Sequence, residues 1–572
     1  MAQPQEHLPG MARQFAWPDL VVSFALVGLL ATMAWLGHDM WVPLRPEITA
    51  SLDLNPTRLP YYAARSLLRM FIALVASLGF TLVVASWAAK SARAARVILP
   101  SLDILQSVPV LGFLSATVTF FMALAPGRML GLELASIFAI FTGQVWNLTF
   151  AFHRTLVTLP GEQVEAVRLY QLSAWQRFTH LELPAGVIPL VWNGMMSFGG
   201  GWFFLAASEA ITVLNQEFVI PGIGSYMAFA VRAKDVPALA WALLTMAGVI
   251  LLVDRGFWRP LVAWSEKFKF EDVPGTEPQR SLALEFLRRS RLTTGFGRLL
   301  ARADERVDRL WRHLAAGRAA AGTRTARGGG LLPILLWAVL GLFAVRGAAF
   351  VATAVSWDEA LRILGLGALT LTRVGAVLAF SAAVWTPVGV WVGLNPRVAQ
   401  IAQPVAQLLA SFPANFLFPF VTILFLHLHW SLEWGGALLM TLGAQWYVLF
   451  NTIAGAMGIP SDLREMGRNF RLQGVAWWRT LILPAIFPAW VTGALTAAGG
   501  AWNASIVAEV VNWGNQRLAA TGLGAYITEA TTKGDWPRIV LGVAVMSAYV
   551  VTLNQLIWRP LGRLAERRCP LG

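Results

Sequence analysis

Two charged segments of this chain carry the residue types and spacing that point to a defined chemistry. Each segment has an acid, a base three residues later and, after a gap, a Leu-x-Leu-Pro run. The residues are Glu165, Arg168, Leu183 and Pro184 in the first segment, and Glu465, Arg468, Leu483 and Pro484 in the second. The pattern lacks a nucleophile with an adjacent base, so it predicts binding of a partner rather than covalent catalysis.

Each segment is expected to form a short helix in a loop between two apolar spans. Pro160 and Pro460 suit a first helical turn, and the acids that follow them are favoured near a helix N-terminus. The Leu-Pro step then ends the segment, because the residue before a proline disfavours the helical conformation. A rigid element presented twice suits docking of a soluble partner with matching twofold symmetry.

The two segments belong to a long direct repeat with a constant spacing of 300 residues. Further pairs at this spacing are Gly199/Gly499, Trp202/Trp502, Glu209/Glu509, Gly222/Gly522, Gly224/Gly524 and Trp258/Trp558. Upstream the spacing becomes 304, at Arg69/Arg373, Pro100/Pro404, Ser107/Ser411 and Pro109/Pro413. A repeat longer than solenoid units predicts two whole domains in tandem.

Composition places these domains in a membrane. The chain has 56% hydrophobic and 13% charged residues, whereas a soluble domain has about 25% charged residues. Apolar runs of about 20 residues predict about six spans per half, at 19–38, 66–89, 102–124, 131–152, 185–211, 237–256, 331–351, 364–393, 404–427, 433–455, 485–511 and 537–557. The expected fold class is an all-α polytopic membrane protein made of two tandem direct repeats.

The expected organisation is a first domain at 1–260 with its loop at 160–184, a linker at 261–330, and a second domain at 331–572 with its loop at 460–484. The net charge of +14 is concentrated in the linker region, where 16 Lys and Arg face 8 Asp and Glu between positions 255 and 327. The positive-inside rule therefore favours a cytoplasmic linker and cytoplasmic termini, and no nucleic-acid partner is expected. The linker is expected either to lie on the membrane as a basic amphipathic helix or to pack on its own protein.

The repeated pattern resembles the EAA loop of binding-protein-dependent ABC importer permeases. Over residues 65–260 and 365–560 the chain is similar to the nitrate, sulfonate, taurine and bicarbonate group, in runs such as Ala207-Ser208-Glu209 and Gly222-Ile223-Gly224. The resemblance implies a type I ABC importer-like permease fold, with two permease domains fused in one chain. It also implies that the protein lies in the bacterial cytoplasmic (inner) membrane.

The same resemblance implies the partners and the coupling residues. Two cytoplasmic ABC ATPase subunits would bind ATP and Mg, and a periplasmic or lipid-anchored solute-binding protein would deliver the substrate. The implied ATPase-coupling residues are Glu165, Ala166, Arg168, Gln171, Leu183, Pro184, Glu465, Arg468, Arg471, Leu483 and Pro484.

One departure from the family concerns the loop backbone. The family usually has glycine six residues after the glutamate, where this chain has Gln171 and Arg471. A positive φ is costly for a residue that has a side chain. We therefore expect either regular helix at these positions or a turn taken by a neighbour such as Gly474. The second loop also has Met466-Gly467 in place of two alanines, so the loops are expected to dock unequally.

Two sets of residues are candidates for the transport path. Glu209 and Glu509 are expected either to gate the path across the pseudo-twofold axis or to brace the Gly-x-Gly loop that follows, and repulsion of an anionic cargo favours the brace. The second set comprises Ser107, Pro109, Ser411 and Pro413, which interrupt equivalent spans and either line the path or form packing kinks. Arg69 and Arg373 are expected to snorkel to the outer membrane boundary.

No catalytic residues, metal ligands or cofactor are expected in the chain itself. The sequence has no Gly-x-x-x-x-Gly-Lys-[Ser/Thr] run, so ATP would be bound by a partner. The single cysteine, Cys569, excludes an intrachain disulfide. The resulting prediction is a permease, not an enzyme, that imports a small anion by alternating access. The alternatives are a permease for a quaternary amine, an ion-coupled secondary transporter and a membrane scaffold.

Overall fold

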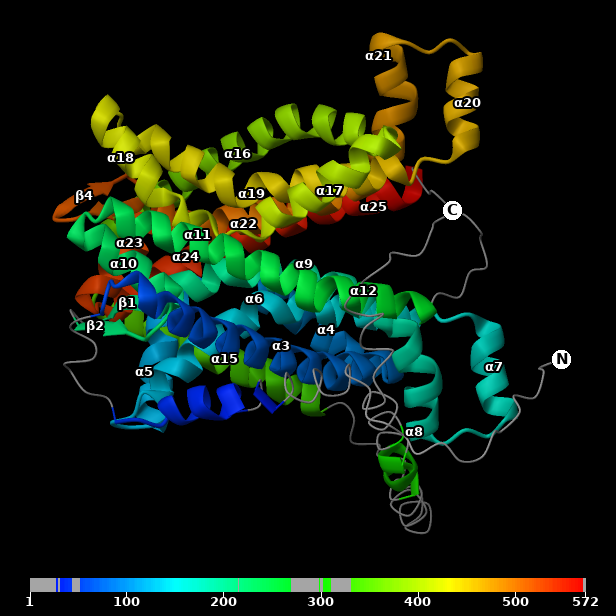
Figure 1. Ribbon diagram of the computed structural model, residues 1–572, viewed down its shortest axis with the longest axis horizontal. Coiled ribbons are helices and arrows are strands. Elements are labelled where there is room, and N and C mark those ends of the chain that lie inside the picture. The colour runs from blue at the N-terminus through cyan, green and yellow to red at the C-terminus, as the bar shows by residue number, and fades with distance from the viewer. Residues whose placement is uncertain are drawn as a thin grey trace, which may run out of the picture. The chain divides into compact units, whose positions relative to one another are not determined.

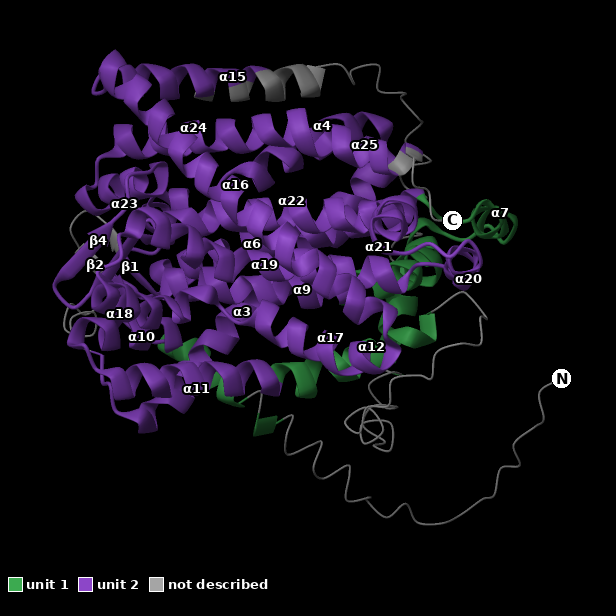
Figure 2. Cartoon of the chain, turned by 90° about the horizontal axis from the view of Figure 1, so that it is seen from above, with its two compact units in different colours: residues 1–39, 158–191, 253–325 green, residues 40–157, 192–252, 326–572 purple. Residues whose placement is uncertain are grey.

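The computed structural model describes residues 27–28, 31–43, 52–213, 216–268, 298, 302–309 and 331–568. The chain divides into two compact units (Figure 2). Unit 1 comprises Met1–Asp39, Thr158–Val191 and Val253–Thr325, and unit 2 comprises Met40–Val157, Trp192–Leu252 and Ala326–Gly572. Unit 2 therefore holds most of both repeat copies, whereas the first charged loop and the linker lie in unit 1.

Helices make up most of the described chain, and the second copy repeats the element order of the first (Figure 1). The helices of the first copy are α3 (Leu59–Lys90), α4 (Ala92–Ser107), α5 (Leu114–Leu124), α6 (Leu130–Val157), α7 (Gly161–Leu169), α8 (Ala174–Arg177), α9 (Leu183–Glu209), α10 (Ile223–Ala233), α11 (Val236–Val253) and α12 (Arg259–Ser265). Their counterparts are α16 (Trp357–Leu394), α17 (Pro396–Ser411), α18 (Phe418–Leu428), α19 (Leu432–Met457), α20 (Ser461–Asn469), α21 (Gly474–Trp477), α22 (Leu483–Ala508), α23 (Leu523–Lys533), α24 (Trp536–Leu553) and α25 (Arg559–Arg568), and they follow α15 (Leu331–Ala352).

Seven helical stretches in the described residues are long and apolar enough to cross a membrane. The number rises to eight if one bent pair of helices is counted as a single span. These stretches contain the spans predicted at 66–89, 131–152, 237–256, 364–393, 433–455, 537–557 and most of 485–511. Helices α9 and α15 coincide with the spans predicted at 185–211 and 331–351, although they are not among the seven. Half of the span predicted at 19–38 lies outside the described residues. A polytopic, predominantly helical fold is therefore confirmed.

The spans predicted at 102–124 and 404–427 are not single straight helices. Helix α4 ends at Ser107, and the helical stretch Val110–Leu124 leaves it at 83°. The break has a local cause, because Val108 precedes Pro109 and takes an extended conformation with φ −78° and ψ 122°. Phe412 before Pro413 does the same in the second copy, between α17 and α18. Each break inserts a short 3₁₀ turn, η2 (Val110–Phe113) and η6 (Ala414–Phe416).

Two short antiparallel β-hairpins were not predicted. Strand β1 (Ala210–Val213) pairs with β2 (Gln216–Val219), and β3 (Val510–Trp513) pairs with β4 (Gln516–Ala519). Each hairpin directly follows the acid that ends the preceding span, Glu209 or Glu509. The fold is therefore predominantly helical rather than strictly all-α.

Four π-helical turns share one cause. They are η3 (Phe178–Glu182), η4 (Asp254–Trp258), η7 (Trp478–Ile482) and η8 (Asn554–Trp558). In each case a proline stands two residues after the turn. Proline has no N–H to continue the i→i−4 ladder, so the backbone widens to i→i−5 bonds such as Leu183 N–H to Phe178 O.

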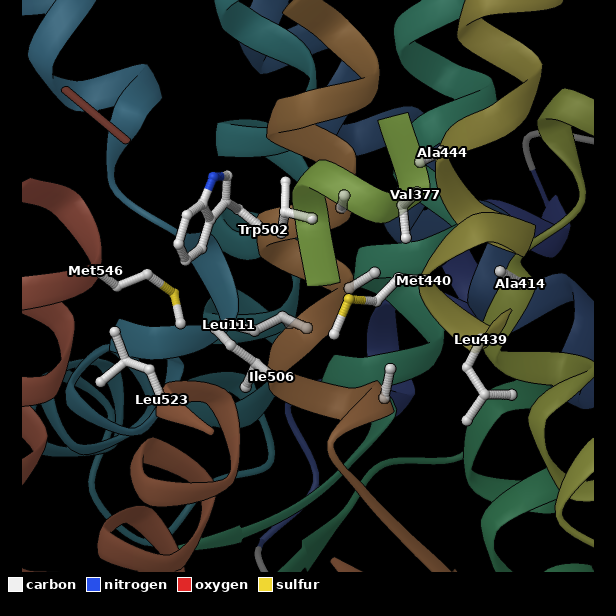
Figure 3. Packing of buried hydrophobic residues seen from close by; sticks show 14 of the residues in the cluster. Leu111, Val377, Ala414, Leu439, Met440, Ala444, Trp502, Ile506, Leu523 and Met546 are labelled. Carbon is white, nitrogen blue, oxygen red and sulfur yellow. The ribbon is translucent and has the colours of Figure 1, made fainter. Parts of the chain in front are cut away.

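The largest core described in unit 2 joins the two copies. Leu111 of η2 packs in one buried cluster with Ile506 of α22 and Met546 of α24 (Figure 3). A Cβ on the neighbouring Gly112 would lie 2.9 Å from a Val543 methyl carbon, so the close approach requires glycine. The break in the first copy thus inserts its 3₁₀ turn between helices of the second copy.

Candidate functional site

The two charged loops have the same internal geometry. Helices α7 and α20 each begin directly after a proline, as expected, and Glu165 and Glu465 are exposed on them. Arg168 and Arg468 are also exposed, and α7 buries none of its residues. Among the described residues these helices therefore present charged side chains to solvent, as a docking surface requires.

The remaining residues of the predicted coupling set differ in exposure. Gln171, Arg471 and Leu483 are exposed, whereas Ala166, Leu183, Pro184 and Pro484 are partly buried. The Leu-Pro steps lie at the start of α9 and α22, directly after the π-helical turns. They therefore join each loop to the long helix that follows rather than present a surface of their own.

The backbone at Gln171 and Arg471 contradicts the expectation from residue type. Both residues have φ of +50°, and Gly474 takes a positive φ in addition rather than instead. Leu172 N–H bonds to Val167 O at 3.2 Å, and Gln171 N–H bonds to Arg168 O at 3.1 Å. This pair of bonds is a Schellman motif, which satisfies the last carbonyls of the helix. The motif recurs at Arg471. Satisfying the last carbonyls of the helix therefore outweighs the cost of a positive φ at a residue that has a side chain.

Gln171→Gly combined with Arg471→Gly is expected to stabilise the two loops by about 0.5–1 kcal/mol each, because glycine adopts a positive φ without steric cost. The measurement is hydrogen exchange at the amides of residues 171, 172, 471 and 472, which should slow. The opposing control is Gln176→Gly, which removes a side chain that caps α8. This variant should speed hydrogen exchange at the amides of α8. Faster exchange in the double glycine variant would contradict the strain argument.

An exposed aromatic pair in these loops was missed by the sequence analysis. Tyr170 is 79% exposed and Phe470 is 73% exposed, and each is the C-cap residue of its loop helix. A large ring held in solvent at the same place in both loops is typical of an interface anchor. The 300-residue spacing would have revealed the pair, since both positions are aromatic.

Part of the linker packs on the first loop inside unit 1. Residues 302–309 form a helix, and the rest of the predicted amphipathic segment lies outside the described residues. Asp308 is buried and accepts a 2.6 Å hydrogen bond from Ser173 Oγ, and Asp304 accepts a 2.7 Å bond from Trp175 Nε1. Ser173 also caps α8 in a capping box with Gln176. These contacts correspond to the alternative in which the linker packs on its own protein.

Asp308→Ala is expected to loosen this contact, because it leaves the partly buried Ser173 hydroxyl without that acceptor at a cost of about 1–3 kcal/mol. Hydrogen exchange of the amides at 302–309 should rise by about tenfold or more, since 1.4 kcal/mol is one factor of ten. Glu305→Ala changes an exposed acid of the same helix and should have little effect. Equal exchange in the two variants would show that the Asp308 contact does not hold the helix.

The acid of the first copy lies in a fully buried ion network inside unit 2. Glu209 accepts hydrogen bonds from Ser66 Oγ at 2.5 Å and from Arg69 Nη1 at 2.6 Å. Its second oxygen accepts the Gly224 N–H at 2.6 Å. A Cβ on Gly222 would lie 2.2 Å from the Glu209 carboxyl carbon, so only glycine fits there. These contacts hold the Gly-x-Gly loop, which is the brace geometry.

Two residues that the sequence analysis missed complete this cluster. Glu133 bonds to Arg69 Nε at 2.5 Å and also contacts Arg65, and all three are buried. Arg69 further donates to Pro221 O at 2.8 Å. The expectation that Arg69 snorkels to the membrane boundary is therefore wrong: two carboxylates hold it inside, because a buried charge needs paired partners.

The second copy repeats the network with one cation fewer. Glu509 accepts bonds from Thr370 Oγ1 at 2.8 Å, from Arg373 Nη1 at 2.9 Å and from Ala525 N–H at 3.1 Å. Arg373 also pairs with Glu433. It is buried, so the snorkelling expectation is wrong here too. The position equivalent to Arg65 is Leu369, which leaves two acids with one base.

Three cavities lie between the two copies within unit 2. A hairpin cavity of about 290 Å³ is lined by α10, α18 and β3. A narrow cavity of about 50 Å³ lies between Gly199 and Phe412, and a central cavity of about 250 Å³ is lined by α4, α6, α22 and α24. The narrow and central cavities share four lining residues, Phe204, Tyr447, Gly500 and Asn503. Neither Glu209 nor Glu509 is among the residues that line these three cavities.

The Ser-Pro interruptions of both copies reach these cavities. Ser107 lines the central cavity and Pro413 lines the narrow one. Ser107 Oγ donates to Asp103 O at 2.8 Å. A Cβ on Gly199 would lie 2.7 Å from Ser411 Oγ, so this serine packs closely on α9 of the other copy. Pro109 is the N-cap of η2 and lines none of the three described cavities.

Residues 81–255 and 385–559 each match the family described as the binding-protein-dependent transport system inner membrane component. Together the two matches cover more than half of the 572 residues. The chain belongs to this family. It is an inner membrane transport permease with two permease copies in one chain, and each match contains one EAA-like loop.

Several curated permeases are similar to this permease over about a third of its length. A "Bicarbonate transport system permease protein" of Synechococcus elongatus is 27% identical over 33% of the chain and 64% of its own length. A "Nitrate import permease protein" of Leptolyngbya laminosa is 25% identical over 36% of the chain and 68% of its own length. A "Putative aliphatic sulfonates transport permease protein" of Bacillus subtilis is 27% identical over 42% and 84%. The alignment thus spans just under two thirds of the first of these relatives.

Proposed function

We propose that this permease is the membrane component of an ATP-driven importer that moves a small oxyanion such as bicarbonate, nitrate or a sulfonate. The observation that carries the proposal is the repeated loop. Each copy presents an exposed charged helix that is closed by a Schellman motif and an exposed aromatic ring. Two docking helices that end in the same motif on one chain fit two ATPase subunits.

In the proposed mechanism, two cytoplasmic ATPase subunits bind ATP with Mg and close on each other. The loops, including Glu165 and Glu465, follow them, and the two copies rock to give alternating access. The linker and both termini are then cytoplasmic, and a solute-binding protein delivers the anion from the other side. The buried clusters around Glu209 and Glu509 keep the Gly-x-Gly loops fixed during this motion.

The relatives favour an anion over the other cargoes. Their names refer to bicarbonate, nitrate and aliphatic sulfonates, and none of these is a quaternary amine. A secondary transporter would not need two equal exposed loops. The anion importer therefore accounts for both the loops and the relatives.

The test is uptake into proteoliposomes that carry this permease with the ATPase and binding protein of its own system. Labelled bicarbonate, nitrate, taurine and glycine betaine are compared with ATP, with a non-hydrolysable ATP analogue, and with an ion gradient alone. Uptake of one of the anions that requires ATP hydrolysis is expected. Uptake driven by the gradient alone, or uptake of glycine betaine only, would overturn the proposal.

A further inference from the structure

The lining of the central cavity combines many hydrogen-bonding groups with no ionised side chain. Its polar residues come from both copies, with Gln106, Thr142 and Asn147 from the first and Thr496, Asn503 and Asn554 from the second. No Asp, Glu, Lys or Arg is among the described residues that line it. A cavity of about 250 Å³ with this lining has room for a small polar solute.

Part of the polar lining differs between the two copies of the repeat. Applying the 300-residue spacing to Thr142, Asn147, Thr496 and Asn503 gives Leu442, Tyr447, Met196 and Phe203. Apolar or aromatic side chains thus replace every one of these four hydrogen-bonding residues. Leu442, Tyr447 and Phe203 line the narrow cavity of about 50 Å³, and Tyr447 lines the central cavity as well. The repeat equivalents of these four residues therefore do not reproduce the polar lining, although Ser107 is matched by Ser411 and Asn554 by Asp254.

One buried donor of this cavity lacks a partner. Trp502 is 2% exposed, and its indole nitrogen has no hydrogen-bond acceptor among the described residues. A buried polar group in this state costs about 1–3 kcal/mol, and such groups are rare in folded proteins. Trp502 is also one of the residues that line the central cavity. An acceptor in the cavity that reaches the indole nitrogen would satisfy this donor.

The neighbouring amides retain donor capacity as well. Asn147 Nδ2 donates to Ser197 Oγ at 3.2 Å, and Asn503 Nδ2 donates to Gly499 O at 3.1 Å. Asn503 Oδ1 is occupied, because it accepts the Val110 N–H at 3.0 Å. Each amide has two N–H groups, so each keeps one for a solute. The Thr142 and Thr496 hydroxyls already donate to backbone carbonyls. The donors that remain for an acceptor-rich ligand are therefore the second N–H of each amide and the Trp502 indole.

We propose that the central cavity is the substrate site of the transport path and holds one oxyanion through uncharged donors, with Trp502 Nε1 and the Asn147 and Asn503 amides as the contacts. This inference rests on the proposed anion import and deepens it. Neutral donors hold an anion without a buried cation, so binding stays weak enough for release, as transport requires. The aromatic faces of Trp146, Trp502 and Trp558 would also suit a quaternary amine. Binding of a quaternary amine is therefore one outcome of the test.

The deciding comparison is Trp502→Phe against Trp202→Phe. The two tryptophans are equivalent in the repeat and equally buried at 2% exposure, but only Trp502 lines the central cavity. Phenylalanine keeps an aromatic ring and removes the N–H. In the reconstituted complex, Trp502→Phe should lower ATP-driven anion uptake by about tenfold while stimulation of ATP hydrolysis by the binding protein persists. Trp202→Phe should stay within about twofold of the unchanged protein.

Equal uptake by the two variants, or full uptake by Trp502→Phe, would overturn the site assignment while leaving anion import in place. Absence of ATP-driven uptake by the unchanged protein would instead reject the proposed function.

Direct binding of labelled nitrate, bicarbonate and taurine to the purified permease then tests the cavity by itself, since Trp502→Phe should still lower affinity. If Trp502→Phe does not fold, Asn147→Leu takes its place with the same expectation. Binding of glycine betaine with no anion binding would reject the oxyanion assignment.

Discussion

Replacing Tyr170 and Phe470 together with alanine is expected to abolish coupling between ATP hydrolysis and transport. Each ring is more than 70% exposed at the end of its loop helix, and burial of an aromatic anchor at an interface is commonly worth about 2 kcal/mol or more. Loss of two such anchors weakens ATPase docking by about 30-fold per site or more. The measurement is co-purification of the ATPase with the permease, together with ATP-driven uptake.

Single variants separate the two loops. If the loops dock equally, Tyr170→Ala and Phe470→Ala weaken docking by similar amounts. The linker helix bonds to the first loop through Asp308 and Asp304, so a smaller effect of Tyr170→Ala would indicate that the linker supports that side. Trp357→Ala is the matched control, because Trp357 is an exposed aromatic residue at the start of α16. Unchanged docking in the double variant would show that these rings are not anchors.

Glu209→Gln is expected to destabilise the permease by about 3–5 kcal/mol, the usual cost of removing one partner from a buried ion network. The first cluster contains Arg65 and Arg69 with Glu133 and Glu209, so it is balanced. Removing one negative charge leaves an unpaired positive charge among fully buried side chains. Thermal unfolding of the purified permease in detergent measures the loss as a lower Tm.

Glu509→Gln is expected to cost much less, at about 1 kcal/mol. The second cluster has Arg373 with Glu433 and Glu509, so this substitution leaves one base with one acid. The Glu433 side chain is also 42% exposed and is therefore partly solvated. The main loss is the bond from the Ala525 N–H. An equal or larger fall in Tm for Glu509→Gln than for Glu209→Gln would contradict the charge-balance argument.

A rescue variant makes the comparison sharper. Arg65→Leu in the Glu209→Gln background copies the second cluster, where Leu369 occupies the equivalent position. It removes the unpaired positive charge, so the double variant is expected to recover part of the lost Tm. Arg65→Leu alone should lower Tm, because Glu133 and Glu209 then share one arginine. Failure of the rescue would mean that packing rather than charge dominates at this site.

The loops were predictable because their signals are local. Proline before an acid-rich turn acts over a few residues, and the predicted helices and their exposed charges are present. The expectation that the Leu-Pro step ends the segment is wrong, because Leu183 and Leu483 are helical and a π-helical turn carries the helix past each proline. The conformation of Gln171 and Arg471 was not predictable from residue type. A Schellman motif is set by the hydrogen-bonding needs of the whole helix end, and these outweigh the preference of one residue for negative φ.

The burial of Arg69 and Arg373 shows that the position of an arginine along a span does not by itself predict where its side chain lies. Both residues lie where an arginine in lipid would turn outward, yet each meets acids that are 60 or more residues away in sequence. The spacing of Glu133 and Glu433 carried a signal, since they too are 300 residues apart. Repeat spacing identifies such pairs, but it does not say which of them touch.

The sequence by itself determined the duplication, the membrane setting and the two loops, because repeat spacing, apolar run length and helix-end residues are properties of the linear chain. Tertiary structure alone decided that the repeated acids brace Gly-x-Gly loops and that η2 of one copy enters the core of the other. It also decided that hydrogen-bonding residues of both copies gather around the central cavity. These outcomes depend on which distant side chains meet after packing, and pairing of buried charges and donors is settled only there.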